Sequence, residues 1–113
     1  MIRASVLYPF VPGARFDLDY YLGKHVPLTR SLLEPSGLLR LEVDRGLSAE
    51  EPGSAPRFVC VAHLYFATPA AFQGAMREHG DALAADVPNF TDLDLEIQVS
   101  EIVFSTASSF AGD

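Results

Sequence analysis

The chain has 113 residues, the size of one domain with a core of its own. Eight Lys and Arg against 15 Asp and Glu give a net charge of -7, which excludes the basic surface expected of proteins that bind nucleic acids or anionic membranes. No apolar run approaches the roughly 20 residues that span a bilayer. The single cysteine cannot form an internal disulfide, and no signal-peptide pattern is present. We therefore expect a cytoplasmic protein with no nucleic-acid or membrane partner.

The first third of the chain predicts a strand over residues 2–8, then a Pro- and Gly-containing loop and a helix. Asp17 is a suitable N-cap, and Phe16 and Tyr21 stand at the spacing of a hydrophobic staple. Pro27 lacks a backbone donor, so we expect a kink or restart that leaves a carbonyl unpaired beside His25. Three-and-four spacing predicts one buried helix face made of Leu18, Tyr21, Leu22, His25, Leu28 and Leu32.

The rest of the chain predicts three more strands and a second helix. The strands are expected over residues 38–45, 58–66 and 95–104, and the helix begins after Thr68 as N-cap and stops at Pro88. Residues 46–56 have the composition of a surface loop that covers a pocket mouth. We expect one domain over residues 1–105 and a flexible tail over residues 106–113.

The order strand, helix, strand, strand, helix, strand is typical of the ferredoxin-like α+β fold. It predicts a four-stranded antiparallel sheet with both helices on one face. The strand over residues 58–66 is apolar on both of its faces, so a bare second sheet face would expose a large apolar patch. We expect a homodimer in which two sheets pack face to face, as in a dimeric α+β barrel.

Several motifs resemble those of the EthD family of dimeric α+β barrel proteins. They are Tyr8-Pro9, Phe16-Asp17, Tyr20-Tyr21, His25-Val26-Pro27-Leu28 and, later, Asp86-Val87-Pro88-Asn89-Phe90, and together they cover nearly the whole chain. The resemblance implies a ferredoxin-like subunit in a dimer, with a ligand cleft between helices and sheet. It does not imply one reaction, because relatives include cofactor-free monooxygenases, lactone isomerases and polyketide cyclases or dehydratases that use a His and a Tyr in that cleft.

His25 is the best catalytic candidate, because it lies on the apolar helix face where burial favours a neutral imidazole that can act as a base. The alternative is that His25 donates to the freed carbonyl and only fixes the kink. Tyr20 and Tyr21 point about 100° apart on a helix, so at most one shares the cleft with His25, and we select Tyr21. The hydroxyl of a tyrosine there can stabilise an oxyanion, or the residue can simply lie at the edge of the core with its hydroxyl in water.

Five further residues are expected to contact a ligand if their faces converge on the cleft. They are Tyr8, His63, Tyr65, Phe72 and His79. A metal site made from the three histidines has no short ligand spacing to support it, so we assign no metal and no cofactor. Cys60 has no basic neighbour in the sequence and is expected to be a small buried hydrophobe.

Two functions fit these residues. The first is a cofactor-independent enzyme, an oxidoreductase, isomerase or cyclase/dehydratase, in which His25 takes a proton from a small, largely apolar carbonyl or aromatic compound. The second is a non-catalytic accessory or ligand-binding dimer that supports a catabolic oxidase system. A third reading is a structural dimer whose cleft is filled by its own side chains.

Overall fold

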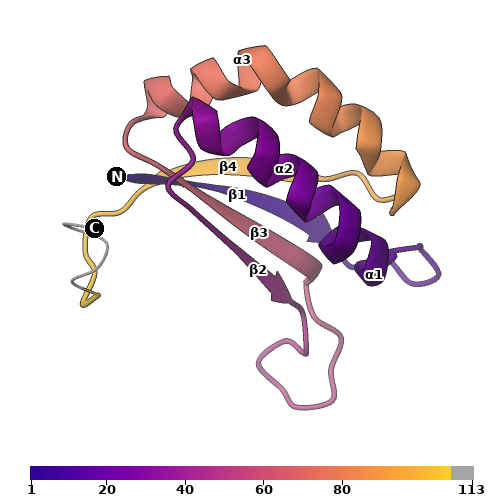
Figure 1. Cartoon of the computed structure of the whole chain (residues 1–113). Helices are drawn as coiled ribbons and strands as arrows, with labels where there is room; N and C mark the ends of the chain where they lie inside the picture. The colour runs from indigo at the N-terminus through magenta and orange to yellow at the C-terminus, as the bar shows by residue number, and fades with distance from the viewer. Residues whose placement is uncertain (108–113) are drawn as a thin grey trace.

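The computed structural model describes residues 1–107, in which one layer of helices covers one face of a single sheet (Figure 1). The elements follow in the order β1 (Ile2–Pro9), α1 (Leu18–Tyr20), η1 (Tyr21–His25), α2 (Val26–Leu33), η2 (Glu34–Ser36), β2 (Arg40–Arg45), β3 (Phe58–Phe66), α3 (Pro69–Asp86), η3 (Val87–Asn89) and β4 (Glu96–Glu101). The four strands form one antiparallel sheet in the order β2-β3-β1-β4. This is the ferredoxin-like arrangement that the element order predicts.

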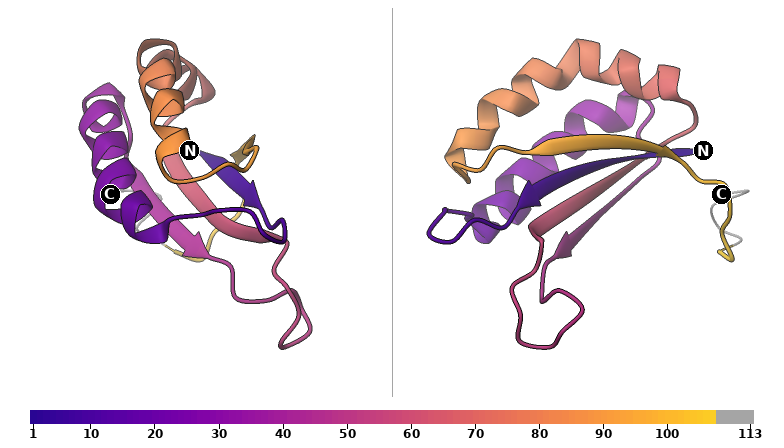
Figure 2. Two further views of the ribbon diagram at one scale, coloured as in Figure 1. Left: turned by 90° about the vertical axis from the view of Figure 1, so that its right-hand side faces the viewer. Right: turned by 180° about the vertical axis from the view of Figure 1, so that it is seen from behind.

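The strand register separates the sheet into two chemically different faces. Residues that stand directly opposite each other in an antiparallel pair share a face, and Ala4 pairs with Leu64 and Tyr8 with Cys60. These four residues are buried under the helices, in or beside the main apolar core. The opposite face has no helix over it in Figure 2. The two-sided pattern predicted for β3 is therefore present, with only one side covered by this chain.

The first helical segment begins where the sequence predicts. The carboxylate of Asp17 accepts a hydrogen bond of 3.0 Å from the backbone N–H of Tyr20. The rings of Phe16 and Tyr21 lie 5.4 Å apart, as expected for a hydrophobic staple. The N-cap and the staple thus fix the start of the segment that carries Tyr21 and His25.

The helix restarts at Pro27 as expected, since α2 begins at Val26 with Pro27 in its first turn, but the form of the change before it differs from the prediction. Tyr21–His25 instead forms a π-helical turn, and the backbone N–H of Val26 donates to Tyr21 O, five residues earlier. The wider turn lets Pro27 occupy the first turn of α2, where a missing backbone donor costs least. Tyr21, His25, Thr29 and Leu33 are consequently the buried positions, spaced by four, while Leu22 is 48% exposed.

The second helix also follows its predicted caps, since Thr68 accepts from the N–H of Ala71 and Pro69 opens the helix. Strands β2 and β4 are shorter than predicted. The first begins at Arg40 within the predicted range 38–45, and the second covers Glu96–Glu101 within the predicted range 95–104. Residues 46–56 project from the sheet end of β2 and β3, and none of them lines the cavity described below, so the expectation that they cover its mouth is wrong (Figure 1). Most of the predicted tail lies outside the described residues.

No helix within residues 1–107 is both long enough and apolar enough to cross a bilayer.

Candidate functional site

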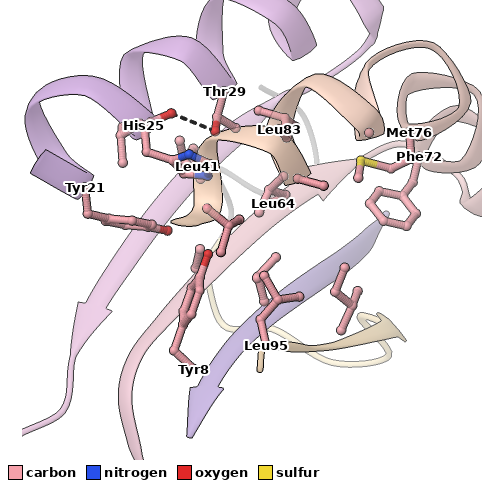
Figure 3. Close-up of a pocket in the computed structure, with 17 residues that line it drawn as sticks. Tyr8, Tyr21, His25, Thr29, Leu41, Leu64, Phe72, Met76, Leu83 and Leu95 are labelled. Carbon is pink, nitrogen blue, oxygen red and sulfur yellow. Dashed lines mark hydrogen bonds between the residues drawn. The ribbon is translucent and has the colours of Figure 1, made fainter. Parts of the chain in front are cut away.

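A cavity of about 120 Å³ lies between the two helices and the covered face of the sheet (Figure 3). Its walls are mainly apolar and come from the sheet and from both helices. The lining residues are Val6, Leu41, Ala62, Leu64, Leu95 and Ile97 on the sheet side, Val26 of α2, and Phe72, Met76, Gly80, Leu83, Ala84 and Val87 on the side of α3. Only Ala84 and Ile97 among the lining residues are exposed. The cavity therefore opens to solvent between α3 and the edge strand β4.

The polar side chains of the lining gather at one end of this cavity. They are Tyr8 from β1, Tyr21 and His25 from the π-helical turn, and Thr29 from α2. Figure 3 shows the hydroxyl ends of Tyr8 and Tyr21 pointing toward each other, with Phe72 and Met76 at the other end. The site is an apolar chamber with one polar end, a shape suited to a compound with one oxygen function and an apolar body.

Both cavity tyrosines are held in their protonated form. Burial, and then the proximity of Cys60, raises the pKa of Tyr8, and a hydrogen bond with Tyr21 offsets part of this rise. Burial, and then the proximity of Tyr8, raises the pKa of Tyr21. Burial first and Asp44 second raise the pKa of the Cys60 thiol to about 12, so it is not a thiolate at neutral pH. The hydroxyls can therefore act as neutral hydrogen-bond donors.

His25 is fixed by a carboxylate that lies 61 positions further along the chain. Its Nδ1 atom is 2.8 Å from Asp86 Oδ2, and the His25 side chain is 9% exposed. The alternative considered from the sequence was a hydrogen bond from His25 to a freed backbone carbonyl, and the structure shows the contact with Asp86 in its place. No hydrogen bond within residues 1–107 reaches Nε2, yet Nε2 is not among the fully buried atoms without a partner, so it borders accessible space. The imidazole is thus oriented at one nitrogen and open at the other.

Asp86 is itself held by two further donors. Tyr20 Oη donates to Asp86 Oδ1 over 2.8 Å, and Asn89 Nδ2 donates to the same oxygen over 3.0 Å. Burial acts to raise the pKa of Asp86, but the hydrogen bonds from Asn89, His25 and Tyr20 outweigh it, and the pKa lies below its ordinary value of 3.8. Asp86 therefore remains a carboxylate beside His25 at neutral pH.

Hydrogen bonds and ring contacts join the two segments that carry this dyad. The Arg15 guanidinium donates to the carbonyl oxygens of Pro88 (2.7 Å) and Asn89 (3.3 Å), just before the first helix. The N–H of Asp17 donates to Phe90 O over 2.8 Å. The Phe90 ring is buried against those of Tyr21 and His25, with centroids 5.0 and 4.7 Å apart. The segment after α3 and the start of the first helix therefore behave as one rigid wall.

Four of the seven predicted site residues line the cavity, namely His25, Tyr21, Tyr8 and Phe72. His63 and Tyr65 do not, because alternation along β3 places them on the uncovered face of the sheet. There His63 contacts Ser5 and Asp44, and Tyr65 donates to Glu42. The expectation that their faces converge on the cleft is therefore wrong.

His79 also lies outside the cavity lining. Its Nε2 is 3.2 Å from Ser36 Oγ, at the end of the helix pair remote from the dyad. The three histidines consequently occupy three separate places. Within the part of the chain that the structure describes, no three His, Cys, Asp or Glu side chains gather closely enough to hold a metal ion.

Comparison with known proteins supports the arrangement. The EthD domain profile matches residues 14–94. The chain belongs to the EthD family. An EthD-like protein from Ralstonia eutropha is 33% identical, with a TM-score of 0.87 over 96% of each chain. An EthD family protein from Bacillus halodurans is 26% identical, with a TM-score of 0.70 over 89% of this chain and 97% of that one.

More distant structures share the fold of this EthD protein. The cofactor-independent oxygenase SnoaB from Streptomyces nogalater is 11% identical, with a TM-score of 0.61 over 93% of this chain and 94% of that one. At that identity the likeness concerns the fold alone. A search of curated proteins found no match to this EthD chain.

Sequence reasoning about this EthD protein missed Asp86, Tyr20 and Thr29 as site residues. Asp86 stands in the Asp86–Phe90 motif that marks the family resemblance, and this was the one signal available for it. Tyr21 and not Tyr20 lines the cavity, in agreement with the expectation that at most one of them does, but the Tyr20 hydroxyl donates to Asp86, the partner of His25. Thr29 donates to the His25 carbonyl over 2.9 Å and joins the lining because the π-helical turn shifts the buried face.

Replacing Asp86 by asparagine is expected to reduce the stability of this EthD protein in a pH-dependent way. A folded-state pKa below 3.8 means that the carboxylate stabilises the fold above that pH and that this contribution is lost as the pH falls through the lowered pKa. The difference in free energy of unfolding between wild type and Asp86→Asn should therefore shrink below about pH 4. Urea unfolding between pH 3 and 7 measures it. Asp81→Asn, at an exposed position of the same helix, is the control, and an equal difference at every pH would contradict the prediction.

Proposed function

We propose that this EthD protein binds a small, largely apolar carbonyl or aromatic compound in the cavity and that His25 acts on it as a base without a cofactor. The observation that supports this most directly is the Asp86–His25 pair, because His25 lines the mainly apolar cavity and its Nε2 has no hydrogen-bond partner within residues 1–107. A carboxylate that fixes one imidazole nitrogen orients the other and stabilises the imidazolium formed when it accepts a proton.

The proposed step is a proton transfer from carbon to nitrogen. Nε2 of His25 forms a bond to the proton alpha to the ligand carbonyl, and the C–H bonding pair moves to form an enolate. The negative charge collects on the ligand oxygen, where a neutral tyrosine hydroxyl can donate a hydrogen bond. The raised pKa values of Tyr8 and Tyr21 keep that proton in place for donation. For a phenol, the same base removes the O–H proton instead.

The size and lining of the cavity limit the ligand. An apolar cavity of about 150 Å³ binds benzene in another protein, and this one has about 120 Å³. A single ring or a chain of similar bulk is therefore the expected scale. A cofactor-free route also agrees with the description of SnoaB, which shares the fold, as a cofactor-independent oxygenase.

Acetophenone in D₂O offers a direct test of this proposal, because it combines one ring with an enolisable carbonyl. ¹H NMR reports both its binding, through shifts of cavity methyl groups such as those of Leu64 and Leu83, and the exchange of its alpha protons for deuterium. Exchange faster than in buffer with added imidazole supports the enzyme. Binding without accelerated exchange supports the accessory or ligand-binding function instead. If acetophenone and phenol both fail to bind, the ligand proposal is wrong.

We further propose that two copies of the chain pack through the uncovered sheet face. This face presents the partly buried apolar side chains of Leu7, Val59 and Val61. It also holds Arg3, whose Nε atom is buried without a hydrogen-bond partner within residues 1–107. A buried donor in that state favours a partner outside this chain.

The dimer is expected to have twice the 12.3 kDa mass of the chain and to dissociate when its apolar centre is charged. Val61→Glu places a carboxylate in the middle of the face, where burying it unpaired is costly. Sedimentation velocity should then give a monomer, while Leu22→Glu on the exposed helix surface should leave the dimer intact. A monomeric wild type at micromolar concentration would rule out this interface.

A further inference from the structure

Gly80 stands at an unusual place for a glycine, inside the long helix α3 and on its cavity side. Glycine in a helix interior is unfavourable relative to alanine. A Cβ atom added at Gly80 would meet only Met76, at 3.5 Å from Cε and 3.9 Å from Cβ, which is ordinary van der Waals contact. The surroundings of Gly80 therefore do not exclude a side chain at a position that lines the cavity.

The side chains that line the cavity from α3 differ in size along the helix. Phe72 and Met76 precede Gly80 at intervals of four residues, and Ala84 follows it. Phe72 and Met76 thus line the far end, and Gly80 and Ala84 leave room beside Leu83 in the half of the helix that leads to Asp86 and the His25 dyad. By helix rise, Gly80 lies ~9 Å before Asp86, about the length of one substituted ring.

We infer that Gly80 sets the width of the cavity and so restricts the ligand to compounds with a single ring, oriented with their oxygen toward Tyr8, Tyr21 and His25. This inference rests on the proposed ligand-binding function. A methyl group at position 80 would contact only Met76 and lies on the side of α3 that lines the cavity, so we expect it to narrow the cavity without disturbing the fold. Met76, whose flexible end is the nearest neighbour, is the one side chain that can adjust.

The chain offers a matched control in Gly74, which lies in the same helix and does not line the cavity. A Cβ atom there would approach only Arg77 Nη2, at 3.7 Å. Gly74→Ala and Gly80→Ala therefore share the gain in helix propensity, and each should raise the Tm by about 4 °C. They differ only in whether the new methyl group enters the cavity.

Binding of phenol and p-cresol, measured by NMR titration, tests the inference. The wild type and Gly74→Ala should bind both compounds alike. Gly80→Ala should weaken p-cresol about 10-fold or more, since one methylene in an apolar pocket is worth roughly 10- to 200-fold. Gly80→Leu should bind neither. Unchanged p-cresol affinity in Gly80→Ala overturns the inference and leaves the proposed function standing.

A xenon titration separates the two possible failures. Xenon occupies apolar cavities whatever their natural ligand, and ¹²⁹Xe NMR detects it. If the wild type binds neither phenol nor p-cresol, the proposed function fails. Xenon binding that is present in wild type and lost in Gly80→Leu still supports the role of Gly80, and xenon binding that is equal in both overturns it.

Discussion

Replacing His25 by alanine is expected to slow deuterium exchange of acetophenone by about 100- to 10,000-fold, the usual contribution of a positioned general base. The expectation follows from the geometry of the dyad. Nδ1 is engaged by Asp86 at 2.8 Å, the opposite nitrogen has no hydrogen-bond partner within residues 1–107, and His25 lines the cavity together with Tyr8 and Tyr21. Removing the imidazole removes the proton acceptor while the apolar walls remain.

Affinity for the ligand should change far less than the exchange rate. Most of the lining is aliphatic or aromatic, and these side chains are distributed over the sheet and both helices. An apolar ligand gains its affinity chiefly from burial against such walls. A large loss of rate with a small change in affinity is the signature of a base, whereas parallel losses of both indicate that His25 mainly shapes the cavity.

The matched control for this experiment is His79→Ala. His79 is also a partly buried histidine on a helix, but it contacts Ser36 and does not line the cavity. Its removal should leave exchange unchanged. Titration of exchange rate against acetophenone concentration separates kcat from KM for both variants. Equal exchange rates in wild type and His25→Ala would exclude the catalytic role.

Truncating Phe90 to alanine is expected to lower the free energy of unfolding by about 3 to 5 kcal/mol, the cost of removing a fully packed aromatic ring. Phe90 is 0% exposed. Its ring centroid lies 5.0 to 5.8 Å from those of Phe16, Tyr8 and Tyr21 and 4.7 Å from that of His25. These neighbours belong to β1, the first helix and the loop between them, so no single segment can move in to fill the space.

Chemical denaturation followed by tyrosine fluorescence measures this loss. The control is Phe104→Ala, because Phe104 is 82% exposed and its truncation should change the unfolding free energy by less than about 0.5 kcal/mol. Phe90→Leu should recover much of the lost stability by refilling the cavity. A cost below about 1 kcal/mol for Phe90→Ala would show that the surrounding rings repack, contrary to the rigid wall that we describe.

Local signals in the sequence predicted most of the helices and strands of the fold. Asp17 and Thr68 start their helices as predicted, because an N-cap satisfies backbone donors within three residues of itself. Both faces of β3 are apolar as predicted, because strand geometry alone places alternate residues on opposite faces. The π-helical turn was not predictable in this way. Its buried residues Tyr21 and His25 pack against Phe90, which lies far along the chain.

The sequence by itself determined the order of the elements, the capped starts of both helices and the choice of His25 and Tyr21 as the residues to examine. Only the tertiary structure decided which histidine reaches the cavity and what holds it there. His63 alternates onto the uncovered side of the sheet, and His79 contacts Ser36. Asp86 reaches His25 across 61 positions of chain. Periodicity predicts which side of its own helix or strand a residue faces. Contact between residues of different elements depends on how those elements pack in the tertiary structure.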